Sequence, residues 1–231
     1  MSLVPRVLTF DTSSARASVA LLEGPQVRAE FRSDSLQAHS TVLLDAIHFL
    51  LGRLGWTLSD LNLVAVGIGP GSFTGIRIGI ATALGISQSL SIPFAGVSGL
   101  EALAYQAARD GRIGVLLDAH RSQVYYAEYD CKNGHIRISQ KSALLDVSDL
   151  ERHLANRHLY IVGDLNACRL EESRGPRSSW PRPISTDLFL AAGIGRLALS
   201  RKRRWRLGDF IACEPMYIRP PDALRKKNGK R

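Results

Sequence analysis

A glycine-rich stretch at residues 67–87, GIGPGSFTGIRIGIATALGIS, directly follows the apolar run Leu63–Val66. Glycine-rich turns between a strand and a helix bind phosphate in several nucleotide-binding folds. A Walker loop, however, needs a lysine where the helix starts, and a dinucleotide fingerprint needs glycine where Thr74 stands. A nucleophile elbow needs glycine two residues before Ser72, where the chain has Pro70. We therefore interpret the stretch as a turn, capped by Ser72 or Thr74, that opens a helix and leaves N–H groups available to an anion.

The helix that follows this turn carries a stripe of small residues, because Gly75, Gly79 and Ala83 are spaced four apart. Glycine inside a helix costs roughly 0.5–1 kcal/mol relative to alanine, so the stripe needs a compensating contact. Close approach of another backbone would supply that contact. The second backbone belongs either to an internal element of this chain or to another chain, and the pattern fits both.

A second predicted helix, over residues 37–55, is apolar on more than one face. Leu43, Ile47 and Leu50 repeat at helical spacing, and further apolar side chains widen the stripe, namely Val42, Leu44, Phe49 and Leu51. This helix is more apolar than a single contact requires, which favours a second contact beside the glycine stripe.

Cysteine and histidine spacing gives no metal or disulfide motif. The three cysteines, Cys131, Cys168 and Cys213, are scattered, and the six histidines contain no pair at spacing four. Asp11 and Asp118 each follow an apolar strand, but the turns after them lack the glycines that wrap a phosphate. We expect both aspartates to stabilise their turns, and we predict no catalytic, cofactor-binding or metal-binding residue in this chain.

The positive charge is concentrated at the C-terminal end. The formal net charge is +9, and residues 169–231 hold 16 Lys and Arg against 6 Asp and Glu. The densest run supplies the candidate RNA contacts Arg201, Lys202, Arg203, Arg204 and Arg206. The alternative is a solvated helix end followed by a frayed tail. With no apolar stretch long enough to span a membrane and no secretion signal at residues 1–6, we expect a cytoplasmic protein without membrane contact.

One structural unit occurs twice along the chain. Predicted strands at 6–10, 17–22 and 26–31 match predicted strands at 115–118, 123–129 and 136–138, with Asp11 and Asp118 107 residues apart. Further strands are expected at 63–68, 93–97 and 159–162, and helices at 100–109, 147–156 and 187–202. The repeat predicts an α/β protein of two related lobes, residues 1–110 and 111–203, followed by a basic segment at 204–231.

Several motifs together resemble the TsaB family of bacterial tRNA-modification proteins. They are Phe10-Asp11-Thr12-Ser13, Ala38-His39-Ser40, the block from Gly69 to Gly79, Val97-Ser98-Gly99-Leu100-Glu101, Val124-Tyr125-Tyr126-Ala127-Glu128 and Glu214-Pro215-Met216-Tyr217-Ile218-Arg219. The resemblance covers nearly the whole chain in order. It implies a duplicated actin-like fold of the sugar kinase and Hsp70 type, with two lobes that each hold a mixed sheet flanked by helices.

The resemblance also implies a role beside a larger paralogue, TsaD, and the ATPase TsaE. Together they transfer threonylcarbamoyl from its adenylate to N6 of the tRNA adenosine 3′ of the anticodon. In that family TsaD holds a metal through two histidines at spacing four, and the corresponding positions here are Gly99 and Leu103. The expected role is therefore a non-catalytic subunit that binds TsaD, contacts tRNA through the complex and forms a homodimer or a monomer when alone. The predicted partner-interface residues are His39, Leu43, Ile47, Leu50, Gly75, Ile76, Gly79 and Ala83.

Two other classes stay open at this point. One is an enzyme of the same superfamily, either metallopeptidase-like or ATPase-like, and the other is an RNA-binding protein that acts alone through its basic C-terminal cluster. Whether a nucleotide binds at the TsaD interface is also open.

Overall fold

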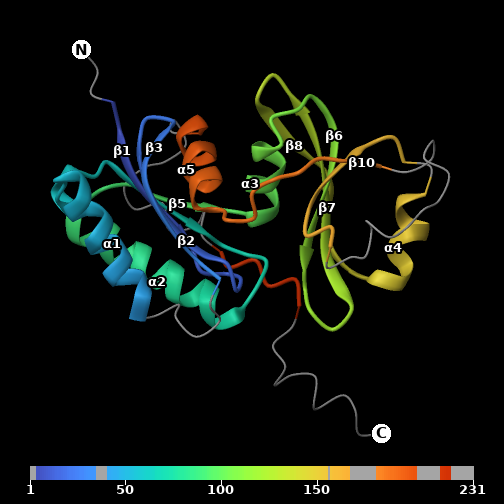
Figure 1. Cartoon of the computed structure of the whole chain (residues 1–231), viewed down its shortest axis with the longest axis horizontal. Coiled ribbons are helices and arrows are strands. Elements are labelled where there is room, and N and C mark those ends of the chain that lie inside the picture. Colours follow the sequence, from blue (N-terminus) through green and yellow to red (C-terminus); the bar gives the residue numbers. More distant parts are fainter. Residues whose placement is uncertain (1–3, 35–40, 156, 167–180, 202–213, 220–231) are drawn as a thin grey trace, which may run out of the picture. The chain divides into compact units, whose positions relative to one another are not determined.

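The computed structural model of the 231-residue chain describes residues 4–34, 41–155, 157–166, 181–201 and 214–219 (Figure 1). The contacts divide the chain into two compact units. Unit 1 comprises Met1–Ala102 and Phe189–Met216, and unit 2 comprises Leu103–Leu188 and Tyr217–Arg231. In the described ranges, no helix has the length and apolar character needed to cross a membrane.

Unit 1 is built on a five-stranded mixed sheet in the order β3-β2-β1-β4-β5. The strands β1 (Arg6–Asp11), β2 (Ala17–Glu23) and β3 (Gln26–Ser33) form an antiparallel meander, while β4 (Leu63–Gly67) and β5 (Phe94–Val97) extend the sheet in parallel with β1. Both faces of the central strands are covered, so β1, β2 and β4 are almost continuously apolar, as buried strands should be.

Helices α1 (Thr41–Leu54) and α2 (Phe73–Leu90) cover one face of this sheet, and α5 (Ala191–Ser200) covers the other, as Figure 1 shows. The first face contributes Leu8, Phe10 and Val66 to a cluster with the inner residues of α1 and α2. On the second face, Gly195 of α5 lies directly against Thr9 and Leu22. Full burial of each large apolar side chain contributes about 1.5–3 kcal/mol, which makes this sandwich the main source of stability in unit 1.

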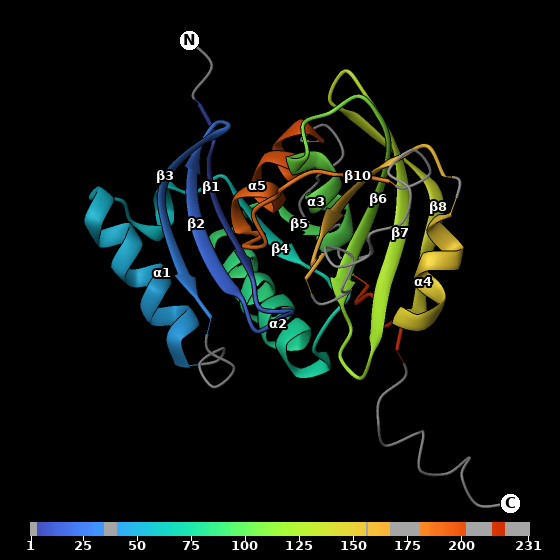
Figure 2. The ribbon, with the colours of Figure 1, turned by 45° about the vertical axis from the view of Figure 1, so that its right-hand side comes forward.

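Unit 2 repeats the plan with the order β10-β9-β6-β7-β8. The strands β6 (Gly111–Asp118), β7 (Gln123–Lys132) and β8 (His135–Asp146) are antiparallel, and β9 (Tyr160–Gly163) and β10 (Arg182–Pro183) continue in parallel. The β7–β8 turn uses Asn133 and Gly134, both at positive φ, as a tight hairpin requires. In Figure 2, α4 (Val147–Leu154) lies beside β8, and its Leu150 and Leu154 pack on Leu116 and Tyr126.

The repeated sheet order confirms the predicted duplication, and every predicted strand and helix has a counterpart. Strand β8 is longer than expected, and the short helix η1 (Leu58–Asp60) and strand β10 had no clear sequence signal. Helix α3 (Gly99–Gln106) contains the position, after Ala102, where the chain passes from unit 1 to unit 2. The predicted second lobe at 111–203 differs from the contacts at its end, because α5 packs on β1 and β2 of unit 1.

Candidate functional site

The turn after β1 is closed by a buried carboxyl group. Asp11 is fully buried, and its two oxygens accept hydrogen bonds from Ser13, one from the backbone N–H at 3.3 Å and one from the hydroxyl at 3.1 Å. Burial raises the pKa of Asp11 to about 6, because desolvation outweighs the two hydrogen bonds that lower it. The side chain also lies on the Cα of Gly67, where any Cβ would overlap Oδ1. Asp11 therefore stabilises the turn, as predicted.

The glycine stripe of α2 packs against this same turn. A Cβ at Gly75 would overlap the carbonyl oxygen of Thr12, and one at Gly79 would lie 2.6 Å from Thr12 Oγ1. Thr12 Oγ1 donates to the carbonyl of Gly75 at 2.7 Å, and the N–H of Ser72 donates to the carbonyl of Ser13 at 2.6 Å. The second backbone that the stripe required is thus an internal one. Ser72 caps α2 as expected, since its Oγ accepts the N–H of Gly75.

This packing corrects most of the predicted partner interface. The α2 residues Gly75, Ile76, Gly79 and Ala83 are buried inside unit 1, and so are the α1 residues Leu43, Ile47 and Leu50, each at most 4% exposed. These seven residues are therefore covered by unit 1 itself, and Leu43, Ile47, Leu50 and Ala83 belong to its hydrophobic core. His39, the eighth, lies outside the described residues.

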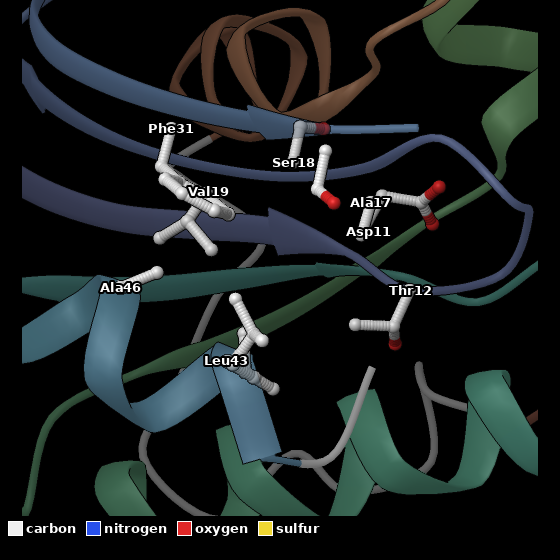
Figure 3. Close-up of a pocket in the computed structure, with 10 residues that line it drawn as sticks. Asp11, Thr12, Ala17, Ser18, Val19, Phe31, Leu43 and Ala46 are labelled. Atoms are coloured by element: carbon white, nitrogen blue, oxygen red, sulfur yellow. The ribbon is translucent and has the colours of Figure 1, made fainter. Parts of the chain in front are cut away.

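A small pocket beside the turn is lined mainly by apolar groups (Figure 3). It lies between α1 and the ends of the first three strands, with Val19, Phe31, Leu43 and Ala46 among its lining residues. Figure 3 shows the Asp11 carboxyl pointing away from Leu43 and Ala46. The apolar side of the pocket is therefore formed by α1 and the strand residues that face it, and its polar lining residues are Asp11, Thr12, Ser18 and Ser33.

The outer face of α1 carries apolar residues that are exposed in this chain. Leu44 is 58% exposed and Phe49 is 60% exposed, and the exposed residues Asp45 and His48 lie on the same face. On α2, the Cζ of exposed Arg77 lies 3.7 Å from the ring centroid of Phe73. The helical period of the buried apolar residues predicts which apolar residues of α1 lie on its opposite, exposed face.

The predicted RNA-contact cluster is largely outside the described residues, which exclude Lys202, Arg203, Arg204 and Arg206. The exception is Arg201, whose guanidinium forms two hydrogen bonds to the carboxylate of Glu101, one of them at 3.0 Å. Both side chains are less than a quarter exposed. Arg201 therefore ties α5 to α3, and its charge is neutralised within unit 1.

In unit 2, the turn after β6 is also held by its aspartate. Asp118 accepts the N–H of His120 at 2.7 Å and contacts the His120 ring at 3.1 Å, so it stabilises its turn as predicted. Residues 120–122 all have positive φ, and Arg219 from the Glu214–Arg219 motif donates to the carbonyl of His120 and to Gln123 Oε1 at 3.3 and 2.5 Å. The motif thus supports a strained turn.

A buried ion pair lies under the same sheet. Glu128, 2% exposed, accepts the hydroxyl of Tyr126 at 2.8 Å and pairs with Arg157. Arg157 also donates to Gln140 at 3.3 Å. In the ranges that the structure describes, no three side chains of His, Cys, Asp or Glu could hold a metal ion. Glu128, Tyr126, Arg157 and Gln140 therefore form one polar cluster that links β7, β8 and the segment after α4.

Comparison with known proteins places this fold in one family. Residues 33–194 match the family model "TsaD: tRNA N6-adenosine threonylcarbamoyltransferase". Proteins named tRNA threonylcarbamoyladenosine biosynthesis protein TsaB are 40% identical over 129 residues in Bacillus subtilis and 39% over 127 in Escherichia coli, covering 55% and 54% of this chain. The matched region spans 56% and 54% of those two relatives, about half their length. A Buchnera aphidicola TsaB is 35% identical over 164 residues, 68% of this chain and 78% of that protein.

Solved structures agree with the sequence matches. An uncharacterized Pseudomonas aeruginosa protein with similarity to peptidase YeaZ superposes with a TM-score of 0.74 at 25% identity, over 93% of this chain and 100% of that one. YeaZ from the same organism gives 0.68 at 28% identity, over 87% and 93%. The activator of 2-hydroxyisocaproyl-CoA dehydratase from Clostridium difficile, at 0.52 and 12% identity over 86% and 96%, shares the fold alone. With the repeated sheets, these neighbours confirm the duplicated actin-like fold.

Proposed function

The chain belongs to the TsaB family, within the group that the TsaD model describes, and from this premise we propose that it is a non-catalytic partner subunit of TsaD. In this role it supports the transfer of threonylcarbamoyl to tRNA adenosine, together with TsaE. The reacting groups and the metal belong to TsaD, and this chain supplies a surface that TsaD binds.

Two features of the chain support a role without chemistry of its own. Gly99 and Leu103, at the positions that correspond to the metal ligands of TsaD, carry no ligating atom, and both are buried. The turn at Asp11, which could otherwise face a phosphate, is covered by the N-terminus of α2 through Ser72 and Gly75. A turn that is already bonded to its own helix has its polar groups satisfied without a ligand.

The observation that carries the proposal is the exposed apolar pair on α1. Among the described residues only six large apolar side chains are strongly exposed, and Leu44 and Phe49 are two of them on one helix. Each would contribute about 1.5–3 kcal/mol if a partner buried it fully. We place the TsaD contact on this outer face, which replaces the buried residues of the original prediction.

The experiment is co-purification with TsaD of the Leu44→Glu/Phe49→Glu variant. We expect the paired fraction to fall at least tenfold, because two charges would be desolvated in the contact. Ile138→Glu is the matched control, since Ile138 is 62% exposed on β8 of unit 2. Undiminished pairing of the α1 variant would refute this placement, and turnover of threonylcarbamoyl adenylate by the isolated chain would refute the non-catalytic role. Mass measurements of each chain alone, and mixed with TsaD, test whether the same face also forms a homodimer.

A further inference from the structure

Tyr160, at the start of β9 in the second sheet, interacts with two arginine side chains. Arg109 Nη2 donates to the Tyr160 hydroxyl at 3.1 Å, and its guanidinium carbon lies 4.8 Å from the ring centroid. Arg182 also hydrogen-bonds to this tyrosine. The hydrogen bond and charge of Arg109, and more weakly those of Arg182, lower the pKa of the Tyr160 phenol. The guanidinium group of Arg109 is therefore held at the phenol oxygen, and that of Arg182 lies close enough to act on the same phenol.

The strand pairing brings these three residues together. Tyr160 begins β9, and its register partner on β10 is Arg182. On its other side, Tyr160 pairs with Ile113 of β6, and Arg109 lies on the segment that leads into that strand. The ring packs on Gly111, where a Cβ would lie 3.3 Å from Cε2, so the absence of a side chain there sets the ring's position. The cluster is thus built by the sheet and is fixed before any ligand arrives.

Among the described residues, no carboxylate forms an ion pair with Arg109 or Arg182. Nearby Arg112 pairs with Asp130 at 3.1 Å, and the carboxylate of Asp110 accepts the N–H of Asn133 at 2.9 Å. In the described part of the chain, the partner of both Arg109 and Arg182 is the neutral Tyr160, and both arginines are exposed. A phenol orders a guanidinium without neutralising it, which leaves two ordered cations facing solvent.

We propose that Arg109, Tyr160 and Arg182 form a binding site for the phosphate backbone of an RNA strand. Guanidinium groups match phosphate oxygens in a bidentate geometry, and ordering them in advance lowers the entropy lost on binding. The site is open, as a continuous backbone requires, and the excess positive charge of the chain favours a polyanion over a single small ion. Because Arg109 lies over the tyrosine ring, the site binds backbone phosphate instead of stacking a base. The choice of RNA rests on the proposed function, in which tRNA is the substrate of the complex.

The test measures binding of tRNA to the complex with TsaD as a function of KCl concentration. In the Arg109→Gln/Arg182→Gln variant we expect about tenfold weaker binding near 0.1 M salt. The slope of log K against log salt should fall by about 1.4–1.8, which corresponds to two lost phosphate contacts. The matched control is Arg28→Gln/Arg152→Gln, which removes the same charge from exposed arginines that already pair with Glu23 at 3.3 Å and Asp149 at 2.6 Å. Its slope should stay close to that of the unsubstituted protein.

Equal slopes for the double variant and its control would overturn the proposal, because net charge alone would then account for binding. The Arg109→Lys/Arg182→Lys variant provides a second reading if the glutamine variant fails to fold: it should keep most of the slope but bind more weakly. Binding of inorganic phosphate to the site at low millimolar concentration would also overturn the proposal, if neither the glutamine nor the lysine double variant changed the affinity for tRNA. Co-purification with TsaD, measured on the same variants, separates these outcomes from failure of the proposed partnership.

Discussion

Replacing Asp11 by asparagine should stabilise the protein at neutral pH. The carboxyl of Asp11 is fully buried, and its pKa is raised from 3.8 to about 6, chiefly by desolvation. A raised pKa means that the folded state holds the proton more tightly than the unfolded state. The stability from this group is therefore fully present below pH 3.8 and is lost as the pH rises through 6. A shift of roughly 2 pKa units corresponds to about 3 kcal/mol.

Asparagine fits the same hydrogen bonds without the charge. Its carbonyl oxygen can accept the N–H of Ser13, and its amide can donate to the Ser13 hydroxyl, which is free to rotate. Asparagine can therefore keep both hydrogen bonds that link Asp11 to Ser13. We expect the difference in unfolding free energy between the variant and the original protein to grow by about 3 kcal/mol between pH 4 and pH 7.

Urea unfolding at several pH values between 4 and 7.5, followed by circular dichroism, measures this difference. Asp60→Asn provides a control of opposite sign, because hydrogen bonds from Thr57 lower the pKa of the Asp60 carboxyl. Its removal should cost stability at pH 7 and little below pH 4. If the unfolding free energies of the Asp11→Asn variant and the unsubstituted protein differ by the same amount at every pH, desolvation is not the dominant effect at this turn.

Two further predictions concern packing. Gly75→Ala should destabilise the protein by about 2 kcal/mol or more, because the added Cβ meets the backbone oxygen of Thr12. Gly85→Ala in the same helix meets no atom and should stabilise the protein by about 0.5–1 kcal/mol. Thermal unfolding compares the two variants, and equal effects would contradict the close approach at Gly75. Arg157→Ala should cost about 3 kcal/mol, because it leaves the carboxylate of Glu128 buried without its ion pair. Adding Glu128→Gln should recover most of that loss in urea unfolding, and a lack of recovery would show that the arginine acts through packing alone.

The glycine stripe shows what sequence reasoning could and could not reach. Spacing and the cost of glycine in a helix predict that a backbone approaches α2 at Gly75 and Gly79; the backbone of Thr12 does so at Gly75, and at Gly79 the approaching atoms belong to the side chains of Thr12 and Val66. The pattern cannot identify that backbone, because Thr12 lies more than sixty residues earlier in the sequence. A segment of the same chain and a segment of a second chain would require the same small residues. The same ambiguity affected α1, where the excess of apolar residues was evident but the pattern did not distinguish the buried positions Leu43, Ile47 and Leu50 from the exposed positions Leu44 and Phe49. Burial decides this, and burial depends on which sheet face the helix meets.

The cluster around Tyr160 has a different origin, since no short motif precedes it. Residues 109, 160 and 182 meet only because β9 pairs in parallel with both β6 and β10. Parallel neighbours are joined by long crossovers, so their register is not written into a turn as it is in the Asn133–Gly134 hairpin. Sequence alone predicted the strand β9 and the arginine-rich character of this end of the chain. It could not predict that Arg182 from this end and Arg109 from the middle of the chain would both act on the phenol of Tyr160, because that depends on the register between strands. Sites of this kind, assembled by parallel strands across a sheet edge, become visible only once the strand order is known.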